Sequence, residues 1–302
     1  MKRAIQAFGS LLKATFLAWR ADNASQQAAA LAFYTLFSLA PVLIIGIAIA
    51  GAVFGEKAAQ GEIFDQVRGM VGDSSAEAIE ALIESASKPH AGLAATIIGV
   101  AAMLVGATAA FAQLRTGLNT VWHVMARPGR GVMGEIQNRF ISFLMVLAIG
   151  ALLLLSLAVS ISFSALTNML SGFLPVIPYM GRFWSFVGSF AIAILLFAMI
   201  FKILPEAKVA WSDVWIGSIA TSLLFTVGKV LIGLYLGRKS VSSAYGAAGS
   251  LIVVFFWVYY SAQILFFGAE FTRVYSERYG TRIVPGRGGV WAGESAAPQR
   301  YE

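Results

Sequence analysis

The sequence predicts an all-α polytopic membrane protein with six transmembrane helices. Three observations support this: 58% of the 302 residues are hydrophobic, only 12% are charged, and six apolar runs are each long enough to cross a bilayer. Soluble domains carry about 25% charged residues, and about 20 apolar residues cross about 30 Å of hydrocarbon. A chain this apolar cannot cover a globular surface with polar groups, so its solvent must be lipid.

The six predicted spans make up a single membrane domain, residues 1–283. Their limits follow from the ends of the apolar runs, which are 28–54, 92–114, 139–165, 182–203, 211–235 and 249–272. The first run exceeds the about 7–15 apolar residues of a signal peptide, so we expect it to remain in the mature chain as a span. Residues 284–302 are rich in Gly, Pro and small side chains, and this composition predicts a disordered cytoplasmic tail.

Lys and Arg residues are distributed unevenly between the two sides of the predicted bundle. Fifteen flank the spans on the side that holds both termini, whereas six lie on the opposite side. Cytoplasmic loops carry an excess of Lys and Arg, so we expect a bacterial inner-membrane protein with its N- and C-termini in the cytoplasm. The same bias, with attraction to anionic lipids, accounts for the net charge of +7 without a nucleic-acid partner.

Two segments outside the spans have the pattern of amphipathic helices. Residues 2–20 place apolar side chains on one face among basic residues, which predicts an N-terminal helix in the membrane interface. Residues 61–88 lie in the outer loop 55–91, which carries seven of the fifteen acidic residues. They predict two short periplasmic helices resting on the bundle, because the segment is too short to bury a core of its own. The acids form either a solvated helical face, which we favour, or a metal site.

Polar side chains near the middle of the predicted spans are candidates for a substrate path, because polar groups inside a membrane are costly. A proline in the first span also removes one helical hydrogen bond and favours a kink. We therefore assign a candidate substrate path to Tyr34, Ser38, Pro41, Thr221, Ser222 and Gln263. The alternative is that these groups only form hydrogen bonds between packed helices. Small residues at a spacing of four, which permits close helix contact, are Gly51 and Gly55, and Gly233 and Gly237.

Four residues fall at the cytoplasmic ends of the second and sixth spans. They form a candidate cytoplasmic mouth of Arg115, Asn119, Trp122 and Glu270. Asn119 and Trp122 are three residues apart and so share a helical face. We expect Glu270 to pair with Arg115 or Arg273 on the same side of the membrane. The predicted topology places Lys229 roughly 18 Å away along the membrane normal, so we expect it to extend toward the outer surface instead.

Residue types that carry catalysis or bind cofactors are missing or far apart. The chain has no cysteine, and its two histidines, His90 and His123, fall on opposite sides of the predicted membrane. No P-loop motif indicates ATP hydrolysis, and no Ser, His and acid can converge as a triad without crossing the bilayer. We therefore predict a protein that is not an enzyme, with no catalytic residue, no metal and no cofactor.

Short motifs in the spans carry a resemblance to a known family. They are Ala30–Pro41 (ALAFYTLFSLAP) in the first span, Leu118–Trp122 (LNTVW) at the end of the second, and Tyr245–Ser250 (YGAAGS) with Gly268–Glu270 (GAE) in the last. In this order, and within six spans, they resemble the YihY/BrkB family of bacterial inner-membrane proteins over about residues 20–280. One departure is Ala40, where relatives have larger aliphatic side chains next to the proline.

The resemblance implies a six-helix inner-membrane fold, with links to serum resistance and the cell envelope. The family once carried the name ribonuclease BN, but metal-dependent phosphodiester cleavage needs clustered carboxylates or histidines, and the acid-rich loop here faces away from cytoplasmic RNA. We therefore predict a transporter or translocase of an envelope-related molecule, with a lipid as one candidate substrate and no ATP hydrolysis of its own. The alternative is a scaffolding protein. Expected partners are membrane lipids, a second copy of the chain or envelope proteins.

Overall fold

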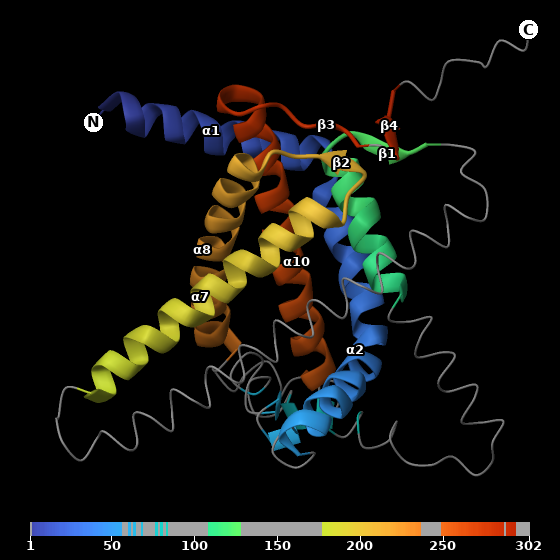
Figure 1. Ribbon diagram of the computed structural model, residues 1–302, viewed down its shortest axis with the longest axis vertical. Coiled ribbons are helices and arrows are strands. Elements are labelled where there is room, and N and C mark those ends of the chain that lie inside the picture. The colour runs from blue at the N-terminus through green and yellow to red at the C-terminus, as the bar shows by residue number, and fades with distance from the viewer. Residues whose placement is uncertain are drawn as a thin grey trace, which may run out of the picture.

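A computed structural model of the protein describes residues 2–55, 108–127, 177–236, 249–286 and 288–293, together with single residues between 60 and 83. The described chain is mainly helical (Figure 1). Its long helices are α1 (Lys2–Ala21), α2 (Ala24–Phe54), α7 (Ile177–Ile203), α8 (Trp211–Leu236) and α10 (Gly249–Tyr279). Residues 108–121 form a further helix, which we call the 108–121 helix.

Three helices of the described chain are long and apolar enough to cross a membrane. Their apolar windows are Phe186–Ile203, Trp211–Ile232 and Ile252–Tyr279. These windows lie in α7, α8 and α10 and correspond to the fourth, fifth and sixth predicted spans. α2 covers the first predicted span, and the 108–121 helix covers the end of the second. Residues 139–165 lie outside the described residues, so the number of six transmembrane helices stays a prediction.

The outward face of α8 indicates that this helix has lipid as its solvent. Its exposed side chains include a long apolar series of Trp211, Trp215, Ile216, Ile219, Leu223, Leu224, Val227, Val230 and Leu231. Water-soluble proteins rarely expose so extended an apolar surface. Tryptophans favour the membrane–water interface, so the two at the start of α8 mark the level of that interface. The same end of the bundle is crossed by α1 (Figure 1).

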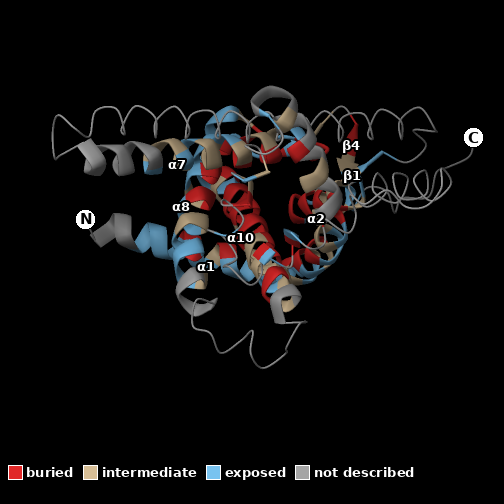
Figure 2. Ribbon diagram, turned by 90° about the horizontal axis from the view of Figure 1, so that it is seen from below, coloured by how far each residue is buried: buried red, intermediate tan, exposed pale blue. Residues whose placement is uncertain are grey.

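α10 is the central helix, and α8, α2 and α1 pack against it, while α7 packs against α8. Buried residues therefore concentrate along α10 (Figure 2). The largest fully buried side chains of the main core are Trp122, Phe201 and Phe266. Phe266 lies over Gly117 of the 108–121 helix, where any side chain would collide with its ring. A small residue at this crossing thus allows the two helices to approach closely.

A second close approach joins α8 to α10 through four residues, which we call the Gly–Thr seam: Gly217, Thr221, Gly268 and Thr272. A side-chain carbon on Gly217 would collide with Thr272, and one on Gly268 would collide with Thr221. The hydroxyls of Thr221 and Thr272 donate to the carbonyls of Gly217 and Gly268 in their own helices, at 2.7 and 2.8 Å. The contact is therefore reciprocal, and both hydroxyls are satisfied inside a closely packed interface.

Two short antiparallel strand pairs cover the end of the bundle where α1 lies (Figure 1). The strands are β1 (Val124–Ala126), β2 (Ala207–Lys208), β3 (Val284–Pro285) and β4 (Gly289–Trp291). β1 pairs with β4, and β2 pairs with β3. The fold is therefore mainly but not purely α-helical, and three segments distant in sequence meet at this end.

The strands correct the prediction of a disordered tail from residue 284. Residues 284–286 and 288–293 are ordered against the rest of the chain, whereas residues 294–302 lie outside the described residues. The Gly-rich composition has a structural reason here. Gly286 donates its N–H to the Glu206 carbonyl at 2.8 Å, and a side chain on Gly289 would collide with that carbonyl. Glycine thus lets the tail approach another backbone closely.

Described residues of the acidic outer loop pack against the bundle, as the amphipathic pattern predicts. Phe64, Ile79 and Ile83 are buried in one cluster with Ile47 of α2 and with the first turns of α10. Glu77 and Glu80 are exposed on the other side. The apolar face of this segment therefore rests on α2 and α10, while its acids face outward.

Replacing Ile79 by alanine should loosen this segment without unfolding the bundle. Truncating a buried isoleucine costs about 2–5 kcal/mol, and we expect the lower end, about 2 kcal/mol, because a peripheral helix can readjust. Amide hydrogen exchange over residues 76–83 should therefore accelerate, while exchange in α10 stays unchanged. Glu77→Gln, on the exposed side of the same segment, is the matched control. Unchanged exchange in the Ile79→Ala variant would contradict the docking.

Candidate functional site

The first-span residues of the candidate path differ in their surroundings. Ser38 is buried, and its hydroxyl donates to the Thr35 carbonyl at 3.0 Å. Tyr34 is exposed, and its ring contacts Phe33 with centroids 5.6 Å apart. α2 continues through Pro41, whose side chain lies outside the described residues. Within α2, only Ser38 therefore presents a buried polar side chain from this set, and its hydroxyl has a partner in its own helix.

Of the candidate path residues of α8 and α10, Thr221 and Ser222 are buried and Gln263 is partly buried, and only Thr221 has its side-chain hydrogen bond satisfied. Thr221 belongs to the Gly–Thr seam and is fully enclosed. The Ser222 hydroxyl and the side-chain oxygen of Gln263 are buried and have no hydrogen-bond partner among the described residues. The same holds for Ser218, one turn before Ser222 on α8. We call Ser218, Ser222 and Gln263 the unpaired polar set.

Two members of the unpaired polar set, Ser222 and Gln263, lie at similar depth. Ser218 and Ser222 each follow a seam residue of α8 by one position. Because Thr221 faces Gly268 across the antiparallel pair, Ser222 is level with residue 267, four residues from Gln263. At 1.5 Å per residue the two side chains differ in depth by about 6 Å. Sequence reasoning missed Ser218, although its spacing of four from Ser222 was a usable signal.

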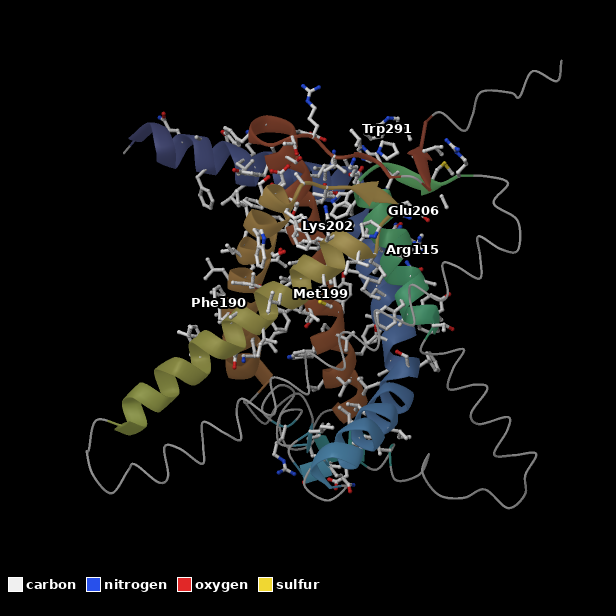
Figure 3. All side chains as sticks on the ribbon, viewed as in Figure 1. Arg115, Phe190, Met199, Lys202, Glu206 and Trp291 are labelled. Carbon is white, nitrogen blue, oxygen red and sulfur yellow. The ribbon has the colours of Figure 1, made fainter. Side chains whose placement is uncertain are left out.

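The predicted cytoplasmic mouth divides into two clusters, and the first surrounds Glu206 in the turn between α7 and α8 (Figure 3). Arg115 forms an ion pair with the Glu206 carboxylate at 2.5 Å. The Asn119 side-chain oxygen accepts the Glu206 N–H at 2.9 Å. Both helix residues therefore hold the turn that leads into β2. Sequence reasoning missed Glu206, because nothing local indicates that a loop acid is buried.

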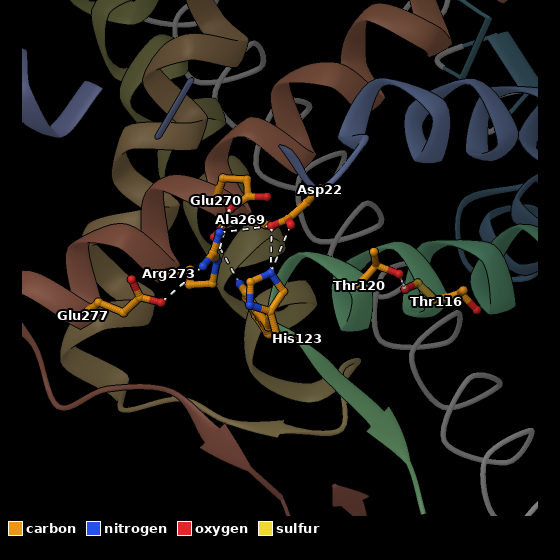
Figure 4. A network of polar contacts seen from close by, with 9 residues as sticks. Asp22, Thr116, Thr120, His123, Ala269, Glu270, Arg273 and Glu277 are labelled. Atoms are coloured by element: carbon orange, nitrogen blue, oxygen red, sulfur yellow. Dashed lines mark hydrogen bonds and ion pairs between the residues drawn. The ribbon is translucent and has the colours of Figure 1, made fainter. Parts of the chain in front are cut away.

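The second cluster surrounds Arg273 near the end of α10 (Figure 4). Its guanidinium donates to Glu270 at 2.9 and 3.2 Å, to Asp22 at 3.0 Å and to Glu277 at 3.2 Å. Asp22 also lies 3.0 Å from the Nε2 atom of His123. Of the two expected partners for Glu270, the structure selects Arg273. We call Asp22, His123, Glu270, Arg273 and Glu277 the charged cluster.

Helix ends position the charged cluster. Asn23 (φ 49°) turns the chain from α1 into α2 and leaves Asp22 pointing at α10, and His123 (φ 54°) follows the end of the 108–121 helix. Asn is among the few residue types that enter this left-handed region readily. The Trp122 indole donates to the Ala269 carbonyl at 3.1 Å, which brings the 108–121 helix to the residue preceding Glu270. Trp122 and Glu270 are thus neighbours, whereas Arg115 and Asn119 bind Glu206 in the first cluster.

A buried acid outside the predicted set, Asp213, joins the start of α8 to the end of α10. Its carboxylate accepts from the Ser276 hydroxyl at 2.8 Å and from both the N–H and the hydroxyl of Thr281, at 3.1 and 3.2 Å. It also sits against Gly280, where a side chain would collide with it. So many donors satisfy the carboxylate fully, which identifies a structural anchor. Among the described residues, no group of three or more His, Cys, Asp and Glu side chains is arranged to hold a metal ion.

Comparison with known proteins gives consistent matches over most of the chain. The family model described as "Virulence factor BrkB" matches residues 15–288. Relatives named UPF0761 membrane proteins include one from Rhodospirillum centenum, 28% identical over 85% of this chain and 55% of its own length. A relative from Psychrobacter is 26% identical over 82% of this chain and 45% of its own length. A relative from Alteromonas mediterranea is 28% identical over 83% of this chain and 82% of its own length. The chain thus spans about half the length of the first two relatives. No solved structure matches it.

Proposed function

Because the chain belongs to the BrkB family of membrane proteins, we propose that it carries an envelope-related molecule, of the lipid or lipid-precursor class, across the bacterial inner membrane without hydrolysing ATP. In this proposal both termini lie in the cytoplasm, and the charged cluster and the strand pairs form the cytoplasmic end. The exposed tryptophans at the start of α8 and the basic, acid-free helix α1 support placing this end at a membrane interface, since tryptophan favours such interfaces and a basic helix is attracted to anionic headgroups.

The unpaired polar set is the observation that carries the proposal. Each buried polar atom without a partner costs about 1–3 kcal/mol, and inside a membrane no bulk water can offset that cost. Three such atoms lie on the two adjacent helices α8 and α10. A molecule with a polar headgroup, or water that accompanies it, would supply the missing partners during passage. Transport thus gives these side chains a role that packing alone does not.

The second candidate function is a scaffold that organises envelope partners. The Gly–Thr seam favours it, because Thr221 is fully enclosed and satisfied within its own helix. A scaffold needs such rigid helix pairs but has no need for unpaired polar atoms beside them. The two functions therefore make different predictions for Ser222 and Gln263.

Lipid movement can be measured with the full chain in vesicles that contain a fluorescent phospholipid, using a membrane-impermeant quencher to count the lipid in the outer leaflet. Wild-type vesicles should lose the protected inner-leaflet signal faster than protein-free vesicles. The double variant Ser222→Ala/Gln263→Met should move lipid roughly thirtyfold more slowly, because two hydrogen bonds of about 1 kcal/mol each are lost to the passing headgroup.

A matched control distinguishes loss of the path from general damage. Ser261→Ala changes a serine of the same helix, whose hydroxyl already donates to the Trp257 carbonyl at 2.8 Å, so lipid movement should stay at the wild-type rate. A wild-type rate equal to that of protein-free vesicles would contradict the transport proposal and favour the scaffold. Equal rates for the double variant and the wild type would remove the unpaired polar set from the path.

A further inference from the structure

The interior of the charged cluster holds more negative than positive charge. Glu270 is 0% exposed and Asp22 is 16% exposed, while Arg273, their shared cation, is 11% exposed. The remaining members lie at the rim, with Glu277 52% and His123 51% exposed. Two enclosed carboxylates therefore share one guanidinium. Unbalanced charge is costly to bury, and a bound proton is the simplest way to neutralise it.

The hydrogen bonds indicate where a proton can bind. Both bonds from Arg273 to Glu270 end on the same carboxylate oxygen, Oε2. The other oxygen, Oε1, is buried and has no partner among the described residues. One guanidinium nitrogen, Nη2, binds Glu270 at 2.9 Å and Asp22 at 3.0 Å, so these two carboxylates face each other across a single atom. A proton on Oε1 would remove the excess charge without breaking any of these bonds.

His123 connects this pair with the solvent. Its ring is half exposed, and its Nε2 atom lies 3.0 Å from both Asp22 oxygens. Either nitrogen of an imidazole ring can carry a proton, so the ring can pass one from water to the carboxylates. The charged groups that the structure brings to the pair are Arg273 and Glu277 from α10, Asp22 from the α1–α2 turn and His123 after the 108–121 helix. The carboxylate of Asp213 in α8 instead accepts hydrogen bonds from Ser276 and Thr281.

We propose that Glu270 and Asp22 form a proton-binding site, which protons reach through His123, and that the bound proton is the coupling ion of transport. The coupling role rests on the transport function proposed above, whereas the proton site does not. The proton arrives on the His123 ring, is passed to the carboxylate pair and leaves the ring neutral; only N–H and O–H bonds change. Gln263 lies seven residues before Glu270 on α10, about 10 Å along the helix, so one rigid element joins the proton site to the unpaired polar set.

Binding of the proton can be tested without any transport. Infrared difference spectra of the purified full chain, recorded between about pH 8 and about pH 5, should reveal the C=O stretch of a buried protonated carboxylic acid in the wild type. The band should disappear in Glu270→Gln and persist in Glu277→Gln, which changes the exposed acid bound to the same arginine. A wild-type protein with no such band would overturn the proton site, whether or not the variants fold.

Coupling is tested in the lipid vesicles with an imposed pH gradient and a clamped membrane potential. If one proton accompanies each molecule, the final distribution of labelled lipid should shift about tenfold for each pH unit, the equivalent of 1.36 kcal/mol. Glu270→Gln should abolish this dependence on the gradient. Lipid movement that ignores the gradient in the wild type would overturn the coupling and leave the proposed transport standing. No movement under any condition would overturn the transport, and the infrared result would still decide the proton site.

Discussion

Replacing Arg273 by methionine should destabilise the protein by about 3–5 kcal/mol, the usual cost of leaving buried charges without their partner. Among the described residues, Arg273 is the guanidinium that binds both Asp22 and Glu270, and both carboxylates are largely enclosed. Methionine keeps much of the apolar stem, so the loss reports on charge more than on packing. Thermal or denaturant unfolding of the detergent-solubilised protein near neutral pH would measure it.

A comparison within the same cluster makes this prediction specific. Glu277→Gln removes an exposed partner of the same guanidinium, and exposed ion pairs contribute about 0–1 kcal/mol, so its effect should be small. At acidic pH the difference in unfolding free energy between Arg273→Met and the wild type should become smaller, because protonation of the carboxylates removes the negative charges that the arginine balances. The charge-balancing role of Arg273 would be contradicted if Arg273→Met lost no more stability than Glu277→Gln. It would also be contradicted if the stability loss of Arg273→Met became larger at acidic pH.

Replacing Gly268 by leucine should separate α8 from α10 and cost about 3 kcal/mol, at the upper end for overpacked cores. The new side chain would occupy the position of Thr221, and the seam allows no shift because Gly217 faces Thr272 in the same way one turn further along. We expect a lower unfolding temperature and a loss of monodisperse protein on size-exclusion chromatography. Proteolysis between α8 and α10 is expected to become faster.

The chain contains its own control for this substitution. Gly188 lies in α7, and a side-chain carbon there would meet nothing within 4 Å, so Gly188→Leu should be neutral or gain slightly from helix propensity. Thr221→Gly should partly rescue Gly268→Ala, since it vacates the space that the new methyl group needs. If the stability losses of Thr221→Gly and Gly268→Ala simply added in the double variant, the two residues would not interact, which would contradict the close contact in the Gly–Thr seam.

Features that depend on averages over neighbouring residues could be predicted from the amino-acid sequence. The apolar runs located the spans now described in α7, α8 and α10, and the pattern of residues 2–20 located α1. The amphipathic pattern of residues 61–88 predicted helices that rest on the bundle, and Ile79 and Ile83 are buried there. Each of these inferences works because hydrophobic transfer is roughly additive along a helix, so no knowledge of distant residues is needed.

Contacts between helix ends could not be predicted from the sequence and emerged only from the folded chain. Arg115 meets Glu206 across 91 positions and Arg273 meets Asp22 across 251, and neither partner had a local signal. The close α8–α10 contact uses Gly217 and Gly268, one glycine from each helix, rather than the glycine pairs recurring within one segment. Strands β3 and β4 of the tail are ordered because they form hydrogen bonds with β2 and β1, which belong to distant segments. Such pairings depend on which helix ends the topology brings together, and periodicity within one segment carries no information about that.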